Sequence, residues 1–414
     1  MTKAASGQTG FPERLLYSIN ARIGGYGLDL NAAEGIQLAY QKGFLGLVLG
    51  YANRQEAVPG HYIRSLEWSP VRMMSFLSSP FYYDAKKRYV DLMAARELRW
   101  TKRYDFFHGW AGNSFKTLRE ANRRNIPSVL EIPTWHRDKG KVKPREKIEV
   151  SKHQKSARFP DTLFTKMLVT RQESLEEYDR ADVLLVPSEC SARTFTAAGI
   201  SRDKIVMLGA GVDISLFEAN PPERIPAQFT AERPMQAIYC GAVIKRKGAH
   251  LLLEAWHRLA LPHAQLTLVG KVHPEVEPYL KEFGGPTVTA AGFSNRVHEL
   301  VKGADVHIFP SECEGSAKTV YEACAAGLAQ ITTFESGDVV EDGYNGLIVP
   351  ANDVPALAAA IQRVYQNPEL LREYSAHARE KAERELTWDH FRERLAAGYR
   401  LAMQRRREAA STAR

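Results

Sequence analysis

Short apolar runs alternate with longer amphipathic stretches along almost the whole chain. Runs of four to eight residues rich in β-branched side chains predict buried strands, and the stretches between them predict helices. In the first half we expect strands at 14–20, 43–50, 104–110, 126–132, 183–188 and 204–208. In the second half we expect strands at 236–241, 265–270, 287–291, 306–309, 329–334 and 346–349. This alternation predicts an α/β protein with two doubly wound, Rossmann-like domains.

The length of 414 residues also favours two domains, because one hydrophobic core rarely serves so long a chain. The proline-rich stretch 221–226 has the composition of a linker. We therefore expect an N-terminal domain over 1–220 and a C-terminal domain over 221–390. Over 391–414 we expect a helix and a basic tail that pack back towards the N-terminal domain, with the end frayed from Arg405 onward.

The composition is that of a soluble globular protein, with 44% apolar and 25% charged residues. The four cysteines show no paired or CxxC spacing, which favours reduced thiols and argues against structural zinc. The N-terminus lacks the apolar core of a signal peptide, and no apolar run approaches the 18 residues of a membrane span. We expect a cytoplasmic protein.

The positive charge is concentrated in the first half of the chain. The net charge is +8, yet segment 86–103 alone carries seven basic and two acidic residues, and segment 136–158 carries nine and three. This predicts an anionic partner, either an acidic acceptor or the inner membrane face, with docking through 62–103 and 137–158. A solvated lysine-rich surface and ordinary core-facing helices explain the same pattern. Nucleic acid is not expected, because no binding module accompanies the charge.

Three features of the first half fall where α/β sheets bind ligands. Gly24 and Gly25 follow the first strand and precede a helix, an arrangement that brings backbone close to a phosphate. The dinucleotide fingerprint is incomplete, because Leu30 replaces its third glycine. His108 and His136 are each expected at the end of a strand, although a lone histidine there is more often a structural hydrogen-bonding group.

The strand at 306–309 leads into the most informative turn of the second half. A helix is expected to begin after Gly315, with free N–H groups near Ser316 and Ala317 that suit an anion. Glu314, in the turn, and Glu322, in the helix, lie eight residues apart, which is at most about 12 Å of helical rise. That spacing suits two carboxylates that reach hydroxyls at opposite ends of a nucleotide sugar. The plainer alternative is that one complements the helix dipole and the other faces water.

Two further turns of the second half complete the pattern. Lys247 and Gly248 follow the first strand of that domain, where a lysine places a point charge for phosphate. Gly292 and Phe293 form a turn wide enough to border a base. With the turn at 342–347 (DGYNGL) and the stretch 310–327, these residues resemble the family-4 retaining glycosyltransferases of GT-B fold, also described as glycosyltransferase group 1.

The resemblance implies two domains that face each other across a cleft and a retaining hexosyl transfer. The donor would be a nucleotide-diphosphate sugar, the acceptor a glycan, a lipid-linked sugar or a small molecule, and no cofactor or metal would be required. Glu314 would contact the transferred sugar, Glu322 the ribose and Lys247 the diphosphate. The residues implied at the donor site are Gly24, Gly25, Lys247, Gly292, Phe293, Glu314, Gly315, Ser316, Ala317, Lys318 and Glu322. On the acceptor side they are His108 and His136, and those implied in catalysis are His108, Lys247 and Glu314.

One departure from the family pattern concerns charge. The family usually has arginine where this chain has Ala242, so Lys247 would carry more of the diphosphate's charge. Lys318 is the first candidate for a substitute cation, although it could also be a solvated lysine; the directions of Lys245 and Arg246 do not follow from the sequence. The alternative functions are a dinucleotide-dependent oxidoreductase, a nucleotide-sugar epimerase and a non-catalytic sensor of sugar nucleotides.

Overall fold

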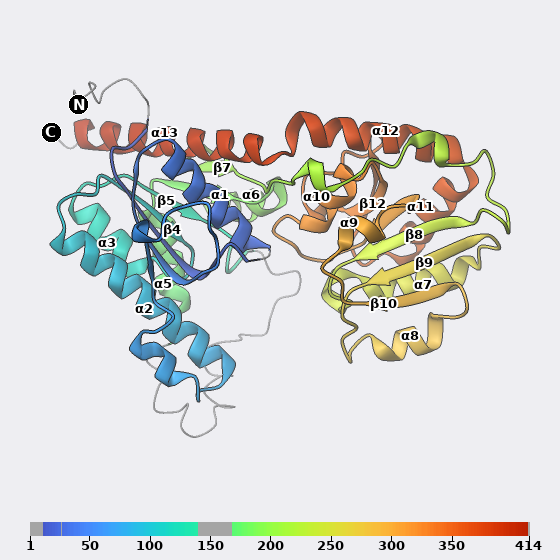
Figure 1. Ribbon diagram of the computed structural model, residues 1–414, viewed down its shortest axis with the longest axis horizontal. Helices are drawn as coiled ribbons and strands as arrows, with labels where there is room; N and C mark the ends of the chain where they lie inside the picture. The colour runs from blue at the N-terminus through green and yellow to red at the C-terminus, as the bar shows by residue number, and fades with distance from the viewer. Residues whose placement is uncertain (1–10, 26, 140–167, 413–414) are drawn as a thin grey trace. The chain divides into compact units, whose positions relative to one another are not determined.

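The computed structural model describes residues 11–25, 27–139 and 168–412, and this part of the chain forms two compact units (Figure 1). The first unit consists of residues 1–186, 191–208 and 392–414, and the second of 187–190 and 209–391. The boundary therefore follows Leu208, earlier than the expected position after Asn220. Asn220 itself is anchored within the second unit, since its backbone N–H donates to the Ala326 oxygen at 2.9 Å.

The first unit contains a parallel sheet with the strand order β3-β2-β1-β4-β5-β6-β7. The order reverses direction between β1 and β4, which makes that point the topological switch of the sheet. The strands are β1 (Leu15–Ile23), β2 (Leu45–Asn53), β3 (Ile63–Ser65), β4 (Phe106–Trp110), β5 (Ser128–Glu131), β6 (Val183–Val186) and β7 (Ile205–Met207).

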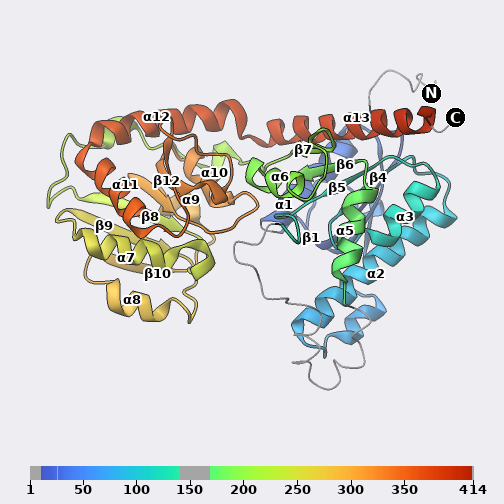
Figure 2. The same cartoon turned by 180° about the vertical axis from the view of Figure 1, so that it is seen from behind.

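Helices cover this sheet and bury its apolar side chains. One face is sealed by a cluster that joins Leu98 of α2, Leu118 of α3 and Tyr178 of α5 to the strands. Helix α3 contacts both α2 and α5, and Figures 1 and 2 draw the three helices close together. The helices are α1 (Leu28–Gln41), α2 (Ser79–Trp100), α3 (Phe115–Arg123), α5 (Arg171–Arg180) and α6 (Glu189–Thr196).

Side-chain hydrogen bonds fix the start of helix α5. It begins after Thr170, whose side-chain oxygen accepts from the Glu173 N–H at 3.2 Å while the Glu173 carboxylate accepts from the Thr170 N–H at 2.8 Å. This reciprocal pair is a capping box, which satisfies two backbone donors and fixes the helix start.

The second unit contains a parallel sheet with the order β10-β9-β8-β11-β12-β13, and its switch lies between β8 and β11. The strands are β8 (Met235–Cys240), β9 (Ala264–Val269), β10 (Val288–Gly292), β11 (Val306–Phe309), β12 (Ala329–Thr333) and β13 (Gly346–Val349). The helices are α7 (Ala249–Leu259), α8 (Glu277–Phe283), α9 (Val297–Leu300), α10 (Lys318–Ala325), α11 (Val354–Gln366) and α12 (Pro368–Glu385). The expected α/β class with two Rossmann-like domains is confirmed.

A buried carboxylate anchors the start of β11. Asp305 is 1% exposed and lies 2.6 Å from Arg233 and 2.9 Å from Arg224, measured between charged atoms. It also accepts from the backbone N–H of Gln236 at 2.7 Å, which ties β11 to the neighbouring strand β8. Burying a carboxylate is tolerable here because cations and a backbone donor replace its water.

The last helix, α13 (Trp388–Thr412), corrects the expectation of a frayed end. It remains helical through Thr412 because its basic side chains find partners in the first unit: Arg405 donates to Asp203 and Arg406 to Asp182, each at 2.8 Å. Residues from Arg392 onward cluster with the first unit. Tyr399 is fully buried there, with its ring centroid 5.1 Å from that of Phe106.

None of the helices in the described part of the chain combines the length and the apolar character needed to cross a membrane.

Candidate functional site

The carboxyl ends of β8 and β11 form the centre of the candidate site in the second unit. The two strands pair side by side, with Val306 opposite Ala237, so the turns that follow them lie together. The turn after β8 contains a short 3-10 helix, Lys245–Lys247, and the loop after β11 leads into α10. Open α/β sheets bind ligands at such a switch point, outside the carboxyl ends of the strands.

Gly248 allows the turn after β8 to pack against the loop after β11. Its φ is +72°, and a Cβ added there would lie 1.9 Å from the carbonyl oxygen of Pro310. Any other residue would therefore clash with backbone. Because the turn is held this closely, the Lys247 ammonium lies 5.1 Å from the centroid of the Phe309 ring.

Two cations converge on one carboxylate oxygen at this point. Glu314 Oε1 lies 3.1 Å from Lys247 Nζ and 2.9 Å from Arg246 Nη1. Arg246 also donates to the carbonyl oxygen of Cys313. Because two positively charged side chains share a single carboxylate, the cluster carries a net positive charge, which suits a phosphate group.

The arginine of this cluster was not among the expected site residues. The sequence places Arg246 in a basic run after a strand but does not show where its side chain points. The structure turns it towards Glu314, where it adds the positive charge that Ala242 cannot supply. Lys318, the expected substitute, instead has its ammonium 5.5 Å from the centroid of the Trp388 ring.

Glu322 lies in the second turn of α10 and is partly buried. Burial raises the pKa of its carboxyl group, and the charge of Lys318 offsets part of that rise. Within the described residues its carboxylate makes no hydrogen bond or ion pair. A partly buried carboxylate of this kind is costly and could accept hydrogen bonds from the hydroxyl groups of a ligand.

The loop at 315–317 differs from the expectation of free N–H groups. The helix begins at Lys318 rather than directly after Gly315, and the N–H of Ala317 donates to the Ser336 oxygen at 2.9 Å. The hydroxyl of Ser316 lies 2.9 Å from that of Tyr321. The loop is thus held by its own hydrogen bonds, and the expectation of a free donor at Ala317 is wrong.

At the edge of the same sheet, β10 ends in the expected turn of Gly292 and Phe293. The Gly292 oxygen accepts from the N–H of Gly270, the residue after β9, at 2.7 Å. The Phe293 side chain is 78% exposed. An exposed ring at the carboxyl edge of the sheet offers a flat apolar face for stacking.

His108 is placed differently from the expectation. It is the middle residue of β4, is 0% exposed and belongs to the first unit. Its Nδ1 lies 2.8 Å from the Tyr399 hydroxyl and its Nε2 lies 3.2 Å from a Glu131 oxygen. Both ring nitrogens are therefore used inside the unit, and the prediction that this side chain ends a strand is wrong.

His136 follows β5, as expected, but its ring is turned inward. It is 5% exposed, its centroid lies 5.1 Å from those of Tyr178 and Phe195, and burial lowers its pKa. The Nδ1 atom accepts from the N–H groups of Asp138 and Lys139, each at 3.2 Å. The imidazole therefore shapes the turn that follows β5.

The close packing around Gly24 and Gly25, which follow β1, explains why both positions are glycine. Gly24 has a φ of +82°, and an added Cβ would lie 2.7 Å from the Cβ of Gln55. At Gly25 an added Cβ would lie 2.4 Å from Asp29 Oδ2. The absence of side chains thus lets the chain turn from β1 into α1 at the switch point of the first sheet.

A buried carboxylate that the sequence did not single out holds the loop after β4. Glu177 of α5 is 1% exposed and accepts from the N–H groups of Gly112 and Ser114 at 2.5 and 2.7 Å. Burial raises its pKa to about 8, and the two N–H groups offset part of the rise. Nothing in the local pattern distinguishes it from its partly exposed neighbour Glu176.

This raised pKa makes stability depend on pH in a definite direction. An acid with a higher pKa in the folded chain stabilises it fully below its ordinary value of 4.5, and that contribution is lost as pH rises through about 8. We expect the free energy of unfolding of the wild type to fall between about pH 5 and about pH 9, and the Glu177→Gln variant to lack this component.

Urea denaturation across that pH range checks the expectation, with Glu176→Gln as the matched control on the same helix. Glu176 is partly exposed and pairs with Arg180 at 2.6 Å. The control should follow the wild-type pH dependence. Parallel slopes for the wild type and Glu177→Gln would contradict the assignment.

Comparisons with known proteins agree with the geometry of the second unit. The sequence model of the family Glycosyl transferases group 1 matches residues 235–367, which include β8, β11 and α10. Over 233 residues the chain is 28% identical to an alpha-maltose-1-phosphate synthase of Mycolicibacterium smegmatis, an alignment that covers 50% of this chain and 59% of that protein.

Solved structures show the same fold over nearly the full length. A sucrose-phosphate synthase from Thermosynechococcus elongatus superposes with a TM-score of 0.67 at 20% identity, covering 94% of this chain and 98% of that one. Anabaena Alr3699/HepE, in complex with UDP, gives a TM-score of 0.64 at 16% identity, covering 93% and 98%. Residues 235–367 therefore match Glycosyl transferases group 1, within a chain that has the two-sheet architecture of the GT-B fold.

Proposed function

We propose that the chain is a retaining glycosyltransferase that moves a hexosyl group from a nucleotide-diphosphate sugar to a glycan or lipid-linked acceptor. The observation that carries the proposal is the arrangement at the switch point of the second sheet. There Arg246 and Lys247 meet Glu314, while Glu322 keeps a carboxylate without a partner on the following helix. The family match over the same residues supports it.

The proposed chemistry is electrostatic. Arg246 and Lys247 would exchange part of their contact with Glu314 for the donor diphosphate, and so leave that carboxylate to contact the transferred sugar. Negative charge grows on the diphosphate as the glycosidic bond breaks, so fixed cations stabilise the transition state more than the bound donor. Glu322 would accept from the ribose hydroxyls, and the exposed ring of Phe293 would border the base.

The roles proposed in the first unit are narrower than the resemblance implied. The Gly24–Gly25 turn remains a candidate for contact with the donor phosphates. His108 is proposed as a positioning residue, because its ring is enclosed by Tyr399 and Glu131. No metal or cofactor is proposed, and within the described residues no three His, Cys, Asp or Glu side chains gather as metal ligands would.

Incubation with a panel of nucleotide sugars tests the proposal. We expect slow hydrolysis of one donor in the absence of acceptor, and release of the sugar with retained anomeric configuration by NMR. If no donor is cleaved and no nucleoside diphosphate binds, the proposal fails. Titration with NAD and NADP tests the oxidoreductase alternative, which no comparison supports and which the incomplete glycine fingerprint disfavours.

The placement of Arg246 predicts that replacing it lowers turnover more than replacing Lys318 does. We expect Arg246→Ala to lower turnover by about tenfold, since the side chain is half exposed and solvent screens part of its charge. Lys318→Ala should change turnover by less than about twofold, because its ammonium contacts Trp388 rather than Glu314. Steady-state rates at saturating donor measure both; the reverse order of effects would make Lys318 the substitute cation.

We also propose a cytoplasmic protein that contacts the inner membrane face through the 3-10 helix Pro70–Met74 and its flanks. Trp68 is 81% exposed, Met73 80% and Phe76 60%, and the guanidinium of Arg72 lies over the Trp68 ring. Exposed aromatic and basic side chains suit a lipid headgroup region. The other expected docking segment, 137–158, lies outside the described residues from 140 onward. Sedimentation with anionic but not neutral vesicles tests the proposal.

A further inference from the structure

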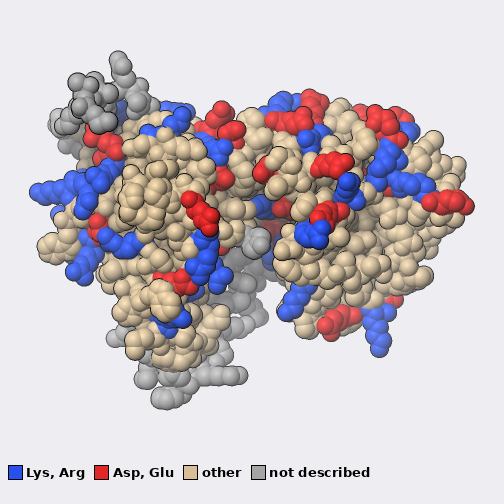
Figure 3. All heavy atoms as spheres, in the orientation of Figure 1, with Lys and Arg blue, Asp and Glu red and all other residues tan. Residues whose placement is uncertain are grey.

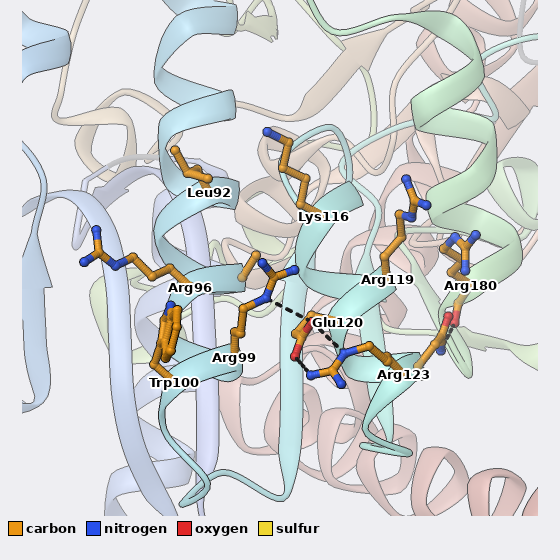
Figure 4. Close-up of a pocket in the computed structure, with 11 residues that line it drawn as sticks. Leu92, Arg96, Arg99, Trp100, Lys116, Arg119, Glu120, Arg123 and Arg180 are labelled. Carbon is orange, nitrogen blue, oxygen red and sulfur yellow. Dashed lines mark hydrogen bonds and ion pairs between the residues drawn. The ribbon is translucent and has the colours of Figure 1, made fainter.

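A basic groove lies on the helical layer of the first unit, away from the residues assigned above. It has a volume of about 870 Å³ and is walled by α2 and α3 (Figure 4). Six lining side chains are basic and one is acidic: Arg96, Arg99, Lys116, Arg119, Arg123 and Arg180 against Glu120. In Figure 3 basic side chains project at the edge of the first unit where Figure 1 draws α3.

The single carboxylate does not neutralise this groove. Glu120 lies 2.5 Å from Arg123 and 3.6 Å from Arg99, so its charge is already shared. Three other cations, Arg96, Lys116 and Arg119, form no ion pair within the described residues. Like charges gathered on one surface create a positive potential, which would attract an anion to this groove.

One end of the groove lies near the carboxyl edge of the first sheet, and the groove extends away from that edge. Helix α3 follows the loop after β4, so Lys116 lies near the carboxyl edge of the sheet, where α/β proteins bind substrates. The nine residues of α3 extend about 13 Å away from that edge, towards Arg123 and Trp100. Cations thus line both walls of the groove over a length greater than the width of one sugar ring.

We propose that this groove binds an extended acidic glycan, the part of the acceptor that lies away from the reacting sugar. The inference rests on the proposed function and adds a class of acceptor to it. The cations are spaced along two walls, as repeated carboxylates or phosphates along a chain would require. Trp100, 77% exposed at the far end, offers a flat apolar face to a sugar ring.

A glycan fits these observations better than a bilayer does. A bilayer surface is flat, whereas these cations line a hollow beside α2 and α3. The exposed side of α2 here presents Arg96 and Arg99 beside Leu92 and Trp100, rather than the continuous apolar face of an interfacial helix. A chain that carries regularly spaced anionic groups can enter such a hollow.

Calorimetric titration with a hexasaccharide of galacturonic acid tests the inference, with its fully methyl-esterified form as the neutral probe. We expect the wild type to bind the acidic form, with an affinity that falls as salt is added, and to bind the neutral form at least about tenfold more weakly. Replacing Arg96, Lys116 and Arg119 together by alanine should weaken binding of the acidic form by about tenfold.

The matched control removes three exposed cations elsewhere, Lys42→Ala, Lys281→Ala and Arg363→Ala, and should bind within about twofold of the wild type. Trp100→Ala should weaken binding several-fold while Trp100→Phe restores most of it. Equal affinity for the two hexasaccharides, or equal losses in the two triple variants, would overturn the inference. The inference would also be overturned if the protein bound phosphatidylglycerol vesicles through the groove cations and did not bind the hexasaccharide.

Donor hydrolysis without acceptor separates this inference from the proposed function. The groove variant should hydrolyse the donor as the wild type does, because none of its three altered residues belongs to the donor cluster. If donor hydrolysis is seen and the acidic hexasaccharide does not bind, the groove inference alone fails. If the hexasaccharide binds through the groove cations, while no donor is hydrolysed and no nucleoside diphosphate binds, the groove stands as a glycan site and the proposed function fails.

Discussion

Replacing Lys247 by alanine is expected to lower turnover by about 100-fold, with a smaller loss of donor affinity. Removal of one fixed charge that faces a developing anion typically costs about 3 kcal/mol of transition-state stabilisation. Lys247 is held for that role, since its ammonium lies 3.1 Å from Glu314 and its turn is packed against Pro310 through Gly248. Turnover at saturating donor and donor affinity by calorimetry measure the two effects separately.

The neighbouring Lys245 provides the matched control. Its ammonium lies 3.1 Å from the Tyr279 hydroxyl and 4.7 Å from the centroid of that ring, on a different contact from Lys247. Lys245→Ala removes the same charge from the same turn and should retain most of the turnover. A Lys247→Ala enzyme that keeps more than about a third of wild-type turnover would mean that the leaving charge is met elsewhere.

The largest effect on stability is expected at Asp305. Alanine in its place would leave Arg224 and Arg233 without their shared carboxylate and the N–H of Gln236 without its acceptor. Breaking a buried ion pair from one side costs about 3–5 kcal/mol, because the remaining charge stays desolvated. We expect Asp305→Ala to lower the free energy of unfolding of the second unit by that amount in urea titrations.

The control for Asp305 is an ion pair at the surface. Glu254 pairs with Arg258 one turn along α7, where the arginine side chain is 56% exposed. Glu254→Ala should cost less than about 1 kcal/mol, as exposed pairs do. Similar losses in the two variants would show that burial does not set the cost at Asp305.

Much of the fold, and the meeting of Lys247 with Glu314, could be predicted from sequence because both depend on the pattern of strands and turns. Buried parallel strands appear as continuous apolar runs, and a parallel sheet brings the residues that follow its strands to one edge. Lys247 and Glu314 lie 67 positions apart in the chain, yet each follows a strand of the second sheet. Their meeting follows from the strand order rather than from any contact visible in the sequence.

What could not be predicted depends on distant partners. His108 has a strand-end sequence context, but its side chain is fixed by Tyr399, 291 residues later. The end of α13 has a composition that favours fraying, but Arg406 meets Asp182. The direction of the Arg246 side chain depends on its contact with Glu314, and that direction does not follow from the sequence. Propensity and spacing describe near neighbours, and these three outcomes were decided by tertiary contacts.

Helix α13 begins in the second unit, and its residues from Arg392 onward belong to the first. This has a consequence for the order in which the protein folds during synthesis. The first unit includes the described residues from Arg392 onward, which leave the ribosome after nearly all of the second unit, 209–391, has been synthesised. Until Tyr399 emerges, His108 and the Phe106 ring lack the partner that covers them in the finished protein. The nascent N-terminal sheet therefore keeps these side chains uncovered until α13 has been synthesised, after the second unit.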